Sequence, residues 1–207
     1  YNSFGINQVQ VNDKVGLTFA KALRSILRQD PDVILLGEIR DSETAAISVQ
    51  AAMTGHLLLS TLHTNTAAGA ISRLVDMGVD SYLIGSTLLG VLAQRLVRKL
   101  CSECKEIVTI SDVDSSFFAI PQGTAIYQAC GCEKCNDTGY KGRVAIGEII
   151  TIDAPLLSVI KKNSDEYFIK EHLATTDFIS MQSQLKNMII QGQTSVEEAI
   201  RIGIKEL

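Results

Sequence analysis

The chain has 207 residues, of which 46% are hydrophobic and 20% charged, and its formal net charge is −4. These values exclude a disordered chain and predict a globular protein with a sizeable core. The slightly acidic balance disfavours extended nucleic-acid binding. We find no apolar run of roughly 18 residues that would predict a transmembrane helix, and no leader that would predict secretion.

The N-terminal part of the sequence predicts a helix followed by a strand, a helix and a second strand. Residues 18–29 carry apolar side chains at helical spacing. Residues 33–36 form a continuous apolar run, which is typical of a central strand covered on both faces. The alanine-rich residues 44–54 predict a helix capped by Asp41 or Ser42, and residues 57–62 predict the second strand. We expect these two strands to be parallel, with a right-handed crossover.

A charged residue follows each of these strands. Glu38, with Arg40 and Asp41 beside it, follows the first strand, and His63 follows the second. Because ligands of open α/β sheets bind outside the carboxyl ends of the strands, Glu38 and His63 are candidate functional residues on one side of one sheet. The alternative is that they are ordinary solvated charges at strand ends.

The remaining elements are predicted more coarsely. Residues 66–77 predict a helix, and residues 81–100 form a long amphipathic stretch that ends in a basic group. Residues 111–116, rich in serine and aspartate, predict a loop. Residues 143–151 predict a strand, and three or four short helices are expected over residues 153–207.

All five cysteines lie in one short segment and predict a metal site. Two C-x-x-C pairs, Cys101 with Cys104 and Cys132 with Cys135, are separated by 27 residues. This spacing allows four thiolates to surround one Zn²⁺ ion, and a closed shell of four sulfurs makes the ion structural. Cys130 could replace Cys132 only with poorer geometry. Buried free cysteines would not need this spacing, and two copies without an obvious βαβ unit disfavour a redox pair.

Several long motifs in this order resemble one protein family. Residues 23–41 (LRSILRQDPDVILLGEIRD), residues 54–65 (TGHLLLSTLHTN) and the paired C-x-x-C are similar to the motor ATPases of bacterial type II secretion and type IV pilus assembly. The resemblance implies an α/β fold: the C-terminal part of a RecA-like P-loop ATPase core, a tetracysteine zinc element and a small C-terminal helical subdomain. The implied boundaries are residues 1–100, 101–136 and 137–207.

The resemblance also implies an activity. Such proteins hydrolyse ATP with Mg²⁺ as homo-hexamers, in the cytoplasm at the inner membrane, where they work with an inner-membrane platform and cytoplasmic adaptor proteins. Glu38 matches the glutamate of the family's Walker B box, and His63 matches its His box. Five arginines match positions used at the nucleotide or between subunits: Arg24, Arg28, Arg40, Arg73 and Arg143. For Arg73, an ordinary exposed helical arginine is an equally good interpretation.

Two features qualify this assignment. Gly37 stands where many P-loop ATPases carry an aspartate that organises magnesium, although the family's own pattern has glycine there. No G-x-x-x-x-G-K-[ST] motif occurs in the 207 residues, and the sequence starts at Tyr1 rather than at a methionine. We therefore expect a C-terminal fragment without its Walker A loop, nearly inactive by itself, from a parent ATP hydrolase.

The competing hypothesis is a zinc-ribbon module that binds nucleic acid or a protein partner. Lysines near the cysteines support it, but the acidic balance and the lack of interleaved aromatic residues make a nucleic-acid groove a poor fit. Within the motor family, type II secretion, pilus extension and DNA uptake stay open. Pilus retraction is disfavoured because those relatives usually lack the tetracysteine element.

Overall fold

The computed structural model describes residues 4–203, which divide into two compact units. The first unit comprises the described chain up to Val91 together with Ile150–Thr176. The second comprises Leu92–Ile149 together with the chain from Asp177 to residue 203. Within residues 4–203, no helix combines the length and the apolar character needed to cross a lipid bilayer.

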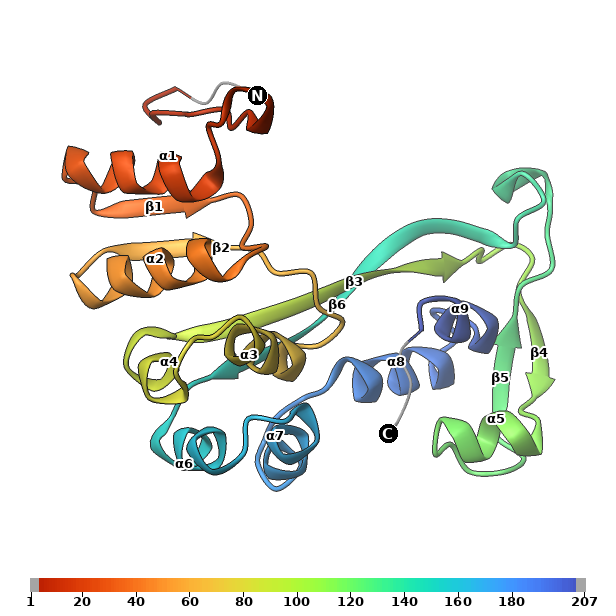
Figure 1. Cartoon of the computed structure of the whole chain (residues 1–207). Helices are drawn as coiled ribbons and strands as arrows, with labels where there is room; N and C mark the ends of the chain where they lie inside the picture. The colour runs from red at the N-terminus through yellow and green to blue at the C-terminus, as the bar shows by residue number, and fades with distance from the viewer. Residues whose placement is uncertain (1–3, 204–207) are drawn as a thin grey trace. The chain divides into compact units, whose positions relative to one another are not determined.

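The first unit consists of a parallel strand pair and its helices (Figure 1). In chain order these are η1 Asp13–Val15, α1 Phe19–Ile26, η2 Leu27–Gln29, β1 Val33–Leu36, α2 Ser42–Met53, β2 Leu57–Ser60, α3 Ala67–Asp76, α4 Ser81–Thr87, α6 Ala154–Lys162 and α7 Glu166–Leu173. Thr18, Asp41 and Thr66 cap α1, α2 and α3 by accepting a backbone N–H with their side chains. The three predicted helices are therefore confirmed, and the cap of α2 is Asp41 rather than Ser42.

Strands β1 and β2 form the predicted strand-helix-strand unit. They pair in parallel, with Val33 opposite Leu57 and Leu36 opposite Ser60. Helix α2 connects them and packs against β2. Because the two strands run in the same direction, the residues that follow them emerge at the same edge of the sheet.

The prediction that β1 is covered on both faces is wrong within the described residues. Ile34 and Leu36 are buried, but Val33 and Leu35 keep 58% and 79% of their surface exposed. In β2, Leu57 and Leu59 are also exposed. Side chains alternate across a strand, so an uninterrupted apolar run cannot reveal that the described helices cover only one face.

The amphipathic stretch at residues 81–100 divides into two elements. Helix α4 ends at Thr87, and strand β3, Gly90–Leu100, follows. Exposure along β3 alternates with a period close to two, and β3 pairs with β6, Tyr140–Thr151. This pairing supplies the backbone hydrogen bonds that a continued helix would otherwise have made.

The second unit carries the longer parts of β3 and β6 together with an antiparallel strand pair and helices. These further elements are β4 Glu106–Thr109, α5 Asp112–Phe117, β5 Ala125–Gln128, η3 Glu133–Cys135, α8 Met181–Ile190 and α9 Val196–Arg201. Strands β4 and β5 are antiparallel, with Glu106 opposite Gln128. The core of the unit contains Val97, Phe118, Ile146 and Leu185, among other apolar side chains.

The loop predicted at residues 111–116 is instead the short helix α5. Ser111 caps it by accepting the backbone N–H of Asp114, and the following Phe118 is buried in the core of this unit. Serine and aspartate disfavour helix interiors but favour helix starts, so the same composition suits a single capped turn. The prediction of three or four helices after residue 153 is confirmed by α6, α7, α8 and α9.

Candidate functional site

The segments that follow β1 and β2 are held together beyond the ends of the strands. The hydroxyl of Thr61 donates to the carbonyl of Gly37 at 2.8 Å, and the backbone N–H of Ile39 donates to the carbonyl of Thr61 at 3.0 Å. These bonds fix Glu38 and His63 on neighbouring stretches of backbone. Thr61 was not among the residues predicted for the site, although a polar residue two positions before His63, at the end of an apolar run, was a usable signal.

Glu38 is bound by both an imidazole and a guanidinium group. Its Oε2 atom lies 2.8 Å from Nε2 of His63 and 2.6 Å from Nε of Arg40. The side chain of Glu38 is 18% exposed, whereas those of His63 and Arg40 are 79% and 62% exposed. The predicted meeting of Glu38 and His63 at one sheet edge is therefore observed.

The charges of this cluster follow from its contacts. The Arg40 guanidinium, and next the His63 imidazole, hold the pKa of the Glu38 carboxyl below its usual range. Glu38 is therefore ionised at neutral pH and can only accept hydrogen bonds. It follows that Nε2 of His63 carries a proton and donates it to Glu38. The cluster thus presents two donors and one acceptor at an exposed edge of the sheet.

The other predicted arginines lie elsewhere. Arg24, in the last turn of α1, forms an ion pair with Glu43 of α2 at 2.8 Å. Arg28 is exposed in η2, and Arg73 is exposed in the last turn of α3. Arg143 is exposed on β6 and belongs to the second unit. Of the five arginines, the structure brings Arg40 to the Glu38–His63 pair.

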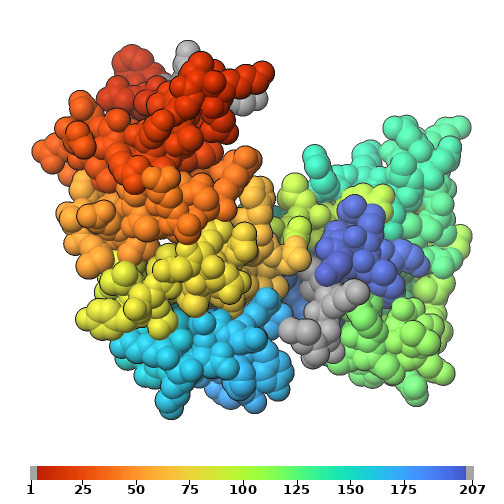
Figure 2. All heavy atoms as spheres, in the orientation of Figure 1, coloured from red at the N-terminus to blue at the C-terminus, as the bar shows by residue number. Residues whose placement is uncertain are grey.

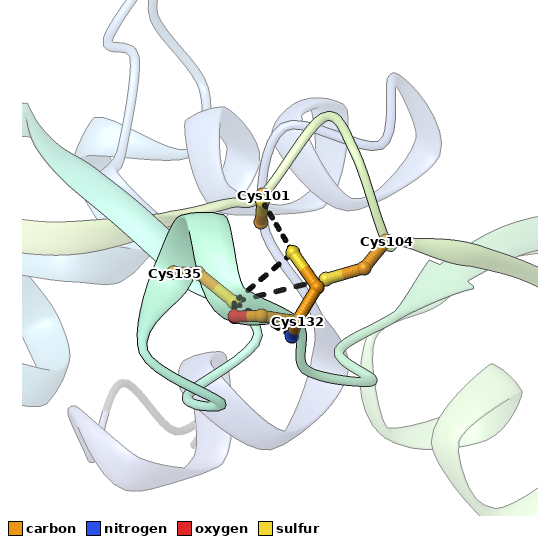
Figure 3. A group of neighbouring side chains, drawn as sticks. All are labelled: Cys101, Cys104, Cys132 and Cys135. Atoms are coloured by element: carbon orange, nitrogen blue, oxygen red, sulfur yellow. Dashed lines mark hydrogen bonds between the residues drawn. The ribbon is translucent and has the colours of Figure 1, made fainter.

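The predicted metal ligands converge in the second unit, as Figure 3 shows. Cys101 follows β3, and Cys104 precedes β4. Cys132 immediately precedes the 3-10 turn η3, and Cys135 is the last residue of that turn. All four Sγ atoms lie within 4.8 Å of one another. The structure places Cys132 rather than Cys130 in this cluster, because Cys130 is exposed and lies outside it.

The sulfur distances fit a tetrahedral ion. The Cys101–Cys132, Cys104–Cys135 and Cys132–Cys135 Sγ pairs are separated by 3.9, 3.8 and 3.8 Å. Four sulfurs about 2.3 Å from a zinc ion would lie about 3.8 Å apart. The donor set and its spacing therefore suit Zn²⁺.

Backbone N–H groups around the second C-x-x-C pair, Cys132 and Cys135, favour the thiolate form by donating hydrogen bonds to sulfur. The N–H groups of Cys132 and Gly139 both donate to Sγ of Cys135 at 3.2 Å. Gly139 has a φ of +74°, and a Cβ atom there would lie 2.6 Å from Cβ of Ala129. Only glycine combines this left-handed backbone with the close approach.

Sequence comparison identifies relatives along nearly the whole chain. A family model described as "Type II/IV secretion system protein" matches residues 1–201. The chain is 49% identical over 206 residues to the type II secretion system protein E of Dickeya dadantii (strain 3937), with 100% of this chain covered. It is 50% identical over 201 residues to the type II secretion system ATPase E of Vibrio cholerae serotype O1. The matches cover 41% and 40% of those relatives, so the chain spans about two fifths of their length.

Structural comparison identifies the same class of protein. The crystal structure of the pilus retraction motor PilT with bound ADP is similar to this chain with a TM-score of 0.61 and 28% identity, over 90% of this chain and 43% of PilT. The ATPase DotB of Legionella pneumophila shares the fold, with a TM-score of 0.60, 23% identity, and coverage of 90% of this chain and 43% of DotB. These likenesses confirm the predicted α/β fold as part of a RecA-like ATPase.

Proposed function

This chain belongs to the family of Type II/IV secretion system proteins, and on that premise we propose that it carries the catalytic edge of an ATP-hydrolysing motor for type II secretion. The observation that carries the proposal is the meeting of Glu38, His63 and Arg40 at the carboxyl edge of a parallel strand pair. The relatives that are 46–50% identical are named as type II secretion proteins, which favours this branch over pilus motors.

In the proposed mechanism, the chain's own residues position a water molecule and balance charge. Glu38 is ionised and accepts a hydrogen bond from the attacking water, while His63 and Arg40 donate to oxygens of the γ-phosphate. Before ATP binds, both donors are engaged with Glu38; a phosphate that draws them away would free the carboxylate for the water. Mg²⁺, when bound with ATP, would neutralise charge on the phosphates. Glu38 would be the carboxylate that serves this ion, directly or through water, because Gly37 has no side chain. Phosphoryl transfer needs mainly such positioning and charge compensation.

The remaining arginines suggest how such a motor assembles. We propose a homo-hexamer in which Arg24, Arg28, Arg73 and Arg143 serve the nucleotide or the neighbouring subunit. Completion of a site by a neighbour's arginine would couple hydrolysis to movement of the ring. The assembly would work in the cytoplasm on the inner membrane, through a membrane platform and adaptor proteins.

The tetracysteine cluster has a structural role in this proposal. Cys101, Cys104, Cys132 and Cys135 would hold one Zn²⁺, with no open position for water or substrate. Its contribution is folding free energy for the segment that carries the four cysteines. The alternative, a zinc-ribbon module for nucleic acid or protein, has no support comparable to the family match.

The test uses a longer protein, of the length of the curated relatives, because these 207 residues contain no G-x-x-x-x-G-K-[ST] loop. Glu38→Gln should leave ATP binding intact and lower kcat by about 100-fold or more, because the positioned carboxylate is lost. The control is Glu197→Gln, which removes an exposed carboxylate on α9 and should leave both quantities unchanged. Full turnover in Glu38→Gln would remove Glu38 from the mechanism.

A further inference from the structure

His63 lies between two threonines that anchor its segment at either end. On one side, Thr61 bonds to Gly37, as described above. On the other side, Thr66 caps α3: its Oγ1 atom accepts the backbone N–H of Gly69 at 3.0 Å and donates to Oε1 of Glu166 at 2.6 Å. The segment that carries His63 is therefore tied to β1 at one end and to a residue 100 positions away at the other.

Glu166 is suited to hold this hydroxyl. It is the first residue of α7, where a negative charge is favoured by the helix dipole, and Lys170 lies 2.8 Å from its Oε1 atom. Burial would raise the pKa of Glu166, but the bonds from Lys170 and Thr66 hold it below its usual range. The carboxylate is thus ionised at neutral pH, and its hydrogen bond with Thr66 is charge-assisted.

Gly69 leaves the space that the hydrogen bond between Thr66 and Glu166 needs where α3 and α7 approach each other. A Cβ atom at Gly69 would lie 2.9 Å from Oγ1 of Thr66 and 3.0 Å from Oε2 of Glu166. Glycine is less favourable than alanine inside a helix, yet here its lack of a side chain gives the carboxylate room to reach the cap. The two helices pack against each other in the first unit, and Figures 1 and 2 show their segments side by side.

We propose that Glu166 is a positioning residue for His63, acting through Thr66 to fix the segment between β2 and α3. Resting on the function proposed above, this assigns a residue of α7 to the same site. Thr64, the residue after His63, links His63 to Thr66, because the Thr64 hydroxyl donates to the carbonyl of Thr66 at 3.2 Å. Without the Glu166 bond, one end of the segment stays fixed at Thr61, while the other end loses the contact that sets where the His63 ring lies. Small displacements of a reacting group are costly in catalysis, so the bond matters for turnover.

The first test needs no ATP and uses this chain. The sequence has three histidines, His56, His63 and His172, so their ring signals can be resolved by NMR. Glu166→Ala and Thr66→Val should shift and broaden the His63 signals and leave those of His56 unchanged. Glu166→Gln and Thr66→Ser each keep the acceptor or the hydroxyl, and they should restore the wild-type spectrum.

Two control variants separate positioning from general loosening of the helices. Ser72→Ala removes a second polar link between α3 and the segment before α7, in which Ser72 donates to the carbonyl of Ser164 at 2.6 Å. Lys170→Met removes the ion pair but keeps the Thr66–Glu166 bond. Both should leave the His63 signals unchanged. An unchanged His63 spectrum in folded Glu166→Ala, or an equal shift in Ser72→Ala, would overturn the proposal.

The second test measures ATP turnover in the longer protein. Glu166→Ala should lower kcat about tenfold with little change in the KM for ATP, and Glu166→Gln should restore kcat. Unchanged kcat in Glu166→Ala, beside an inactive Glu38→Gln, would overturn the positioning role. Full activity of Glu38→Gln would instead overturn the proposed function, while the NMR result would still report on the link to His63.

Discussion

Arg98 and Glu198, one hundred residues apart, are joined by three contacts in the second unit. The backbone N–H of Arg98 donates to Oε1 of Glu198 at 2.9 Å, while its Nε and Nη2 atoms lie 2.8 and 2.7 Å from Oε2. Arg201 binds the same carboxylate from within α9, and the Glu198 side chain is fully buried. The guanidinium of Arg98 also stacks 4.0 Å from the centre of the Tyr140 ring. This cluster fastens α9 to β3.

Glu198→Gln should destabilise the second unit. Burial would raise the pKa of Glu198, but the bonds from Arg201 and Arg98 lower it to about 2. The variant leaves two arginines facing a neutral amide, and the free energy of unfolding should fall by about 2–4 kcal/mol. Chemical denaturation measures this loss, with Glu197→Gln, one residue away and exposed, as the control. Equal stability of the two variants would show that the cluster contributes nothing net.

The same carboxylate should make this loss pH-dependent. A lowered pKa means that the ionised form is favoured in the folded state, so its contribution is present above the ordinary value of 4.5 and is lost as the pH falls towards about 2. The difference in unfolding free energy between wild type and Glu198→Gln should therefore shrink over this window. Denaturation at several pH values checks it; a constant difference from pH 5 to pH 2 would contradict the assigned pKa.

Metal content should depend on Cys132 and not on Cys130. The wild-type chain purified without chelator should contain about one equivalent of zinc, and Cys132→Ser should lose it. Cys130→Ser should keep the zinc, since Cys130 lies outside the sulfur cluster. Because metal binding supplies folding free energy on the order of 10 kcal/mol, chelation should also lower the melting temperature. Elemental analysis decides; full zinc content in Cys132→Ser would contradict the ligand assignment.

Arg40 should influence the Glu38 carboxyl more than His63 does. Arg40→Met should raise the pKa of Glu38 towards its ordinary value by a larger step than His63→Gln, because the guanidinium bond is the main cause of the lowered pKa. NMR titration of the Glu38 side-chain carboxyl measures both steps. A pKa unchanged in Arg40→Met would mean that the 2.6 Å contact does not persist in solution.

The 207 residues alone should bind ATP only weakly. They contain no G-x-x-x-x-G-K-[ST] loop, and the backbone nest of that loop is the main phosphate-binding element of such enzymes. Isothermal titration should give no saturable binding at micromolar ATP. Micromolar affinity would mean that the edge around Glu38 holds phosphate without this loop.

Local signals in the sequence were enough to predict much of this structure. Asp41 and Thr66 cap helices as their side chains suggest, and the C-x-x-C spacing placed Cys101, Cys104, Cys132 and Cys135 together. The parallel pair β1–β2 followed from two apolar runs with a helix between them, and with it came the meeting of Glu38 and His63.

Features that depend on distant contacts were not predictable in this way. The division of residues 81–100 into α4 and β3 depends on pairing with β6, which amphipathic spacing does not reveal. The bonds from Thr66 to Glu166 and from Arg98 to Glu198 each join residues 100 positions apart, and no short-range pattern marks them. The exposure of Val33 and Leu35 likewise depends on which face of β1 the described helices cover, and the composition of the strand does not reveal this.

A double-mutant cycle on kcat of the longer protein would show whether Glu38 and His63 act as one unit in the proposed ATP hydrolysis. Nε2 of His63 lies 2.8 Å from Oε2 of Glu38, so each side chain depends on the other. Glu38→Gln and His63→Gln should therefore lower kcat non-additively. The double variant should turn over about as slowly as the slower single variant. Fully additive losses, or a normal kcat in either single variant, would contradict it.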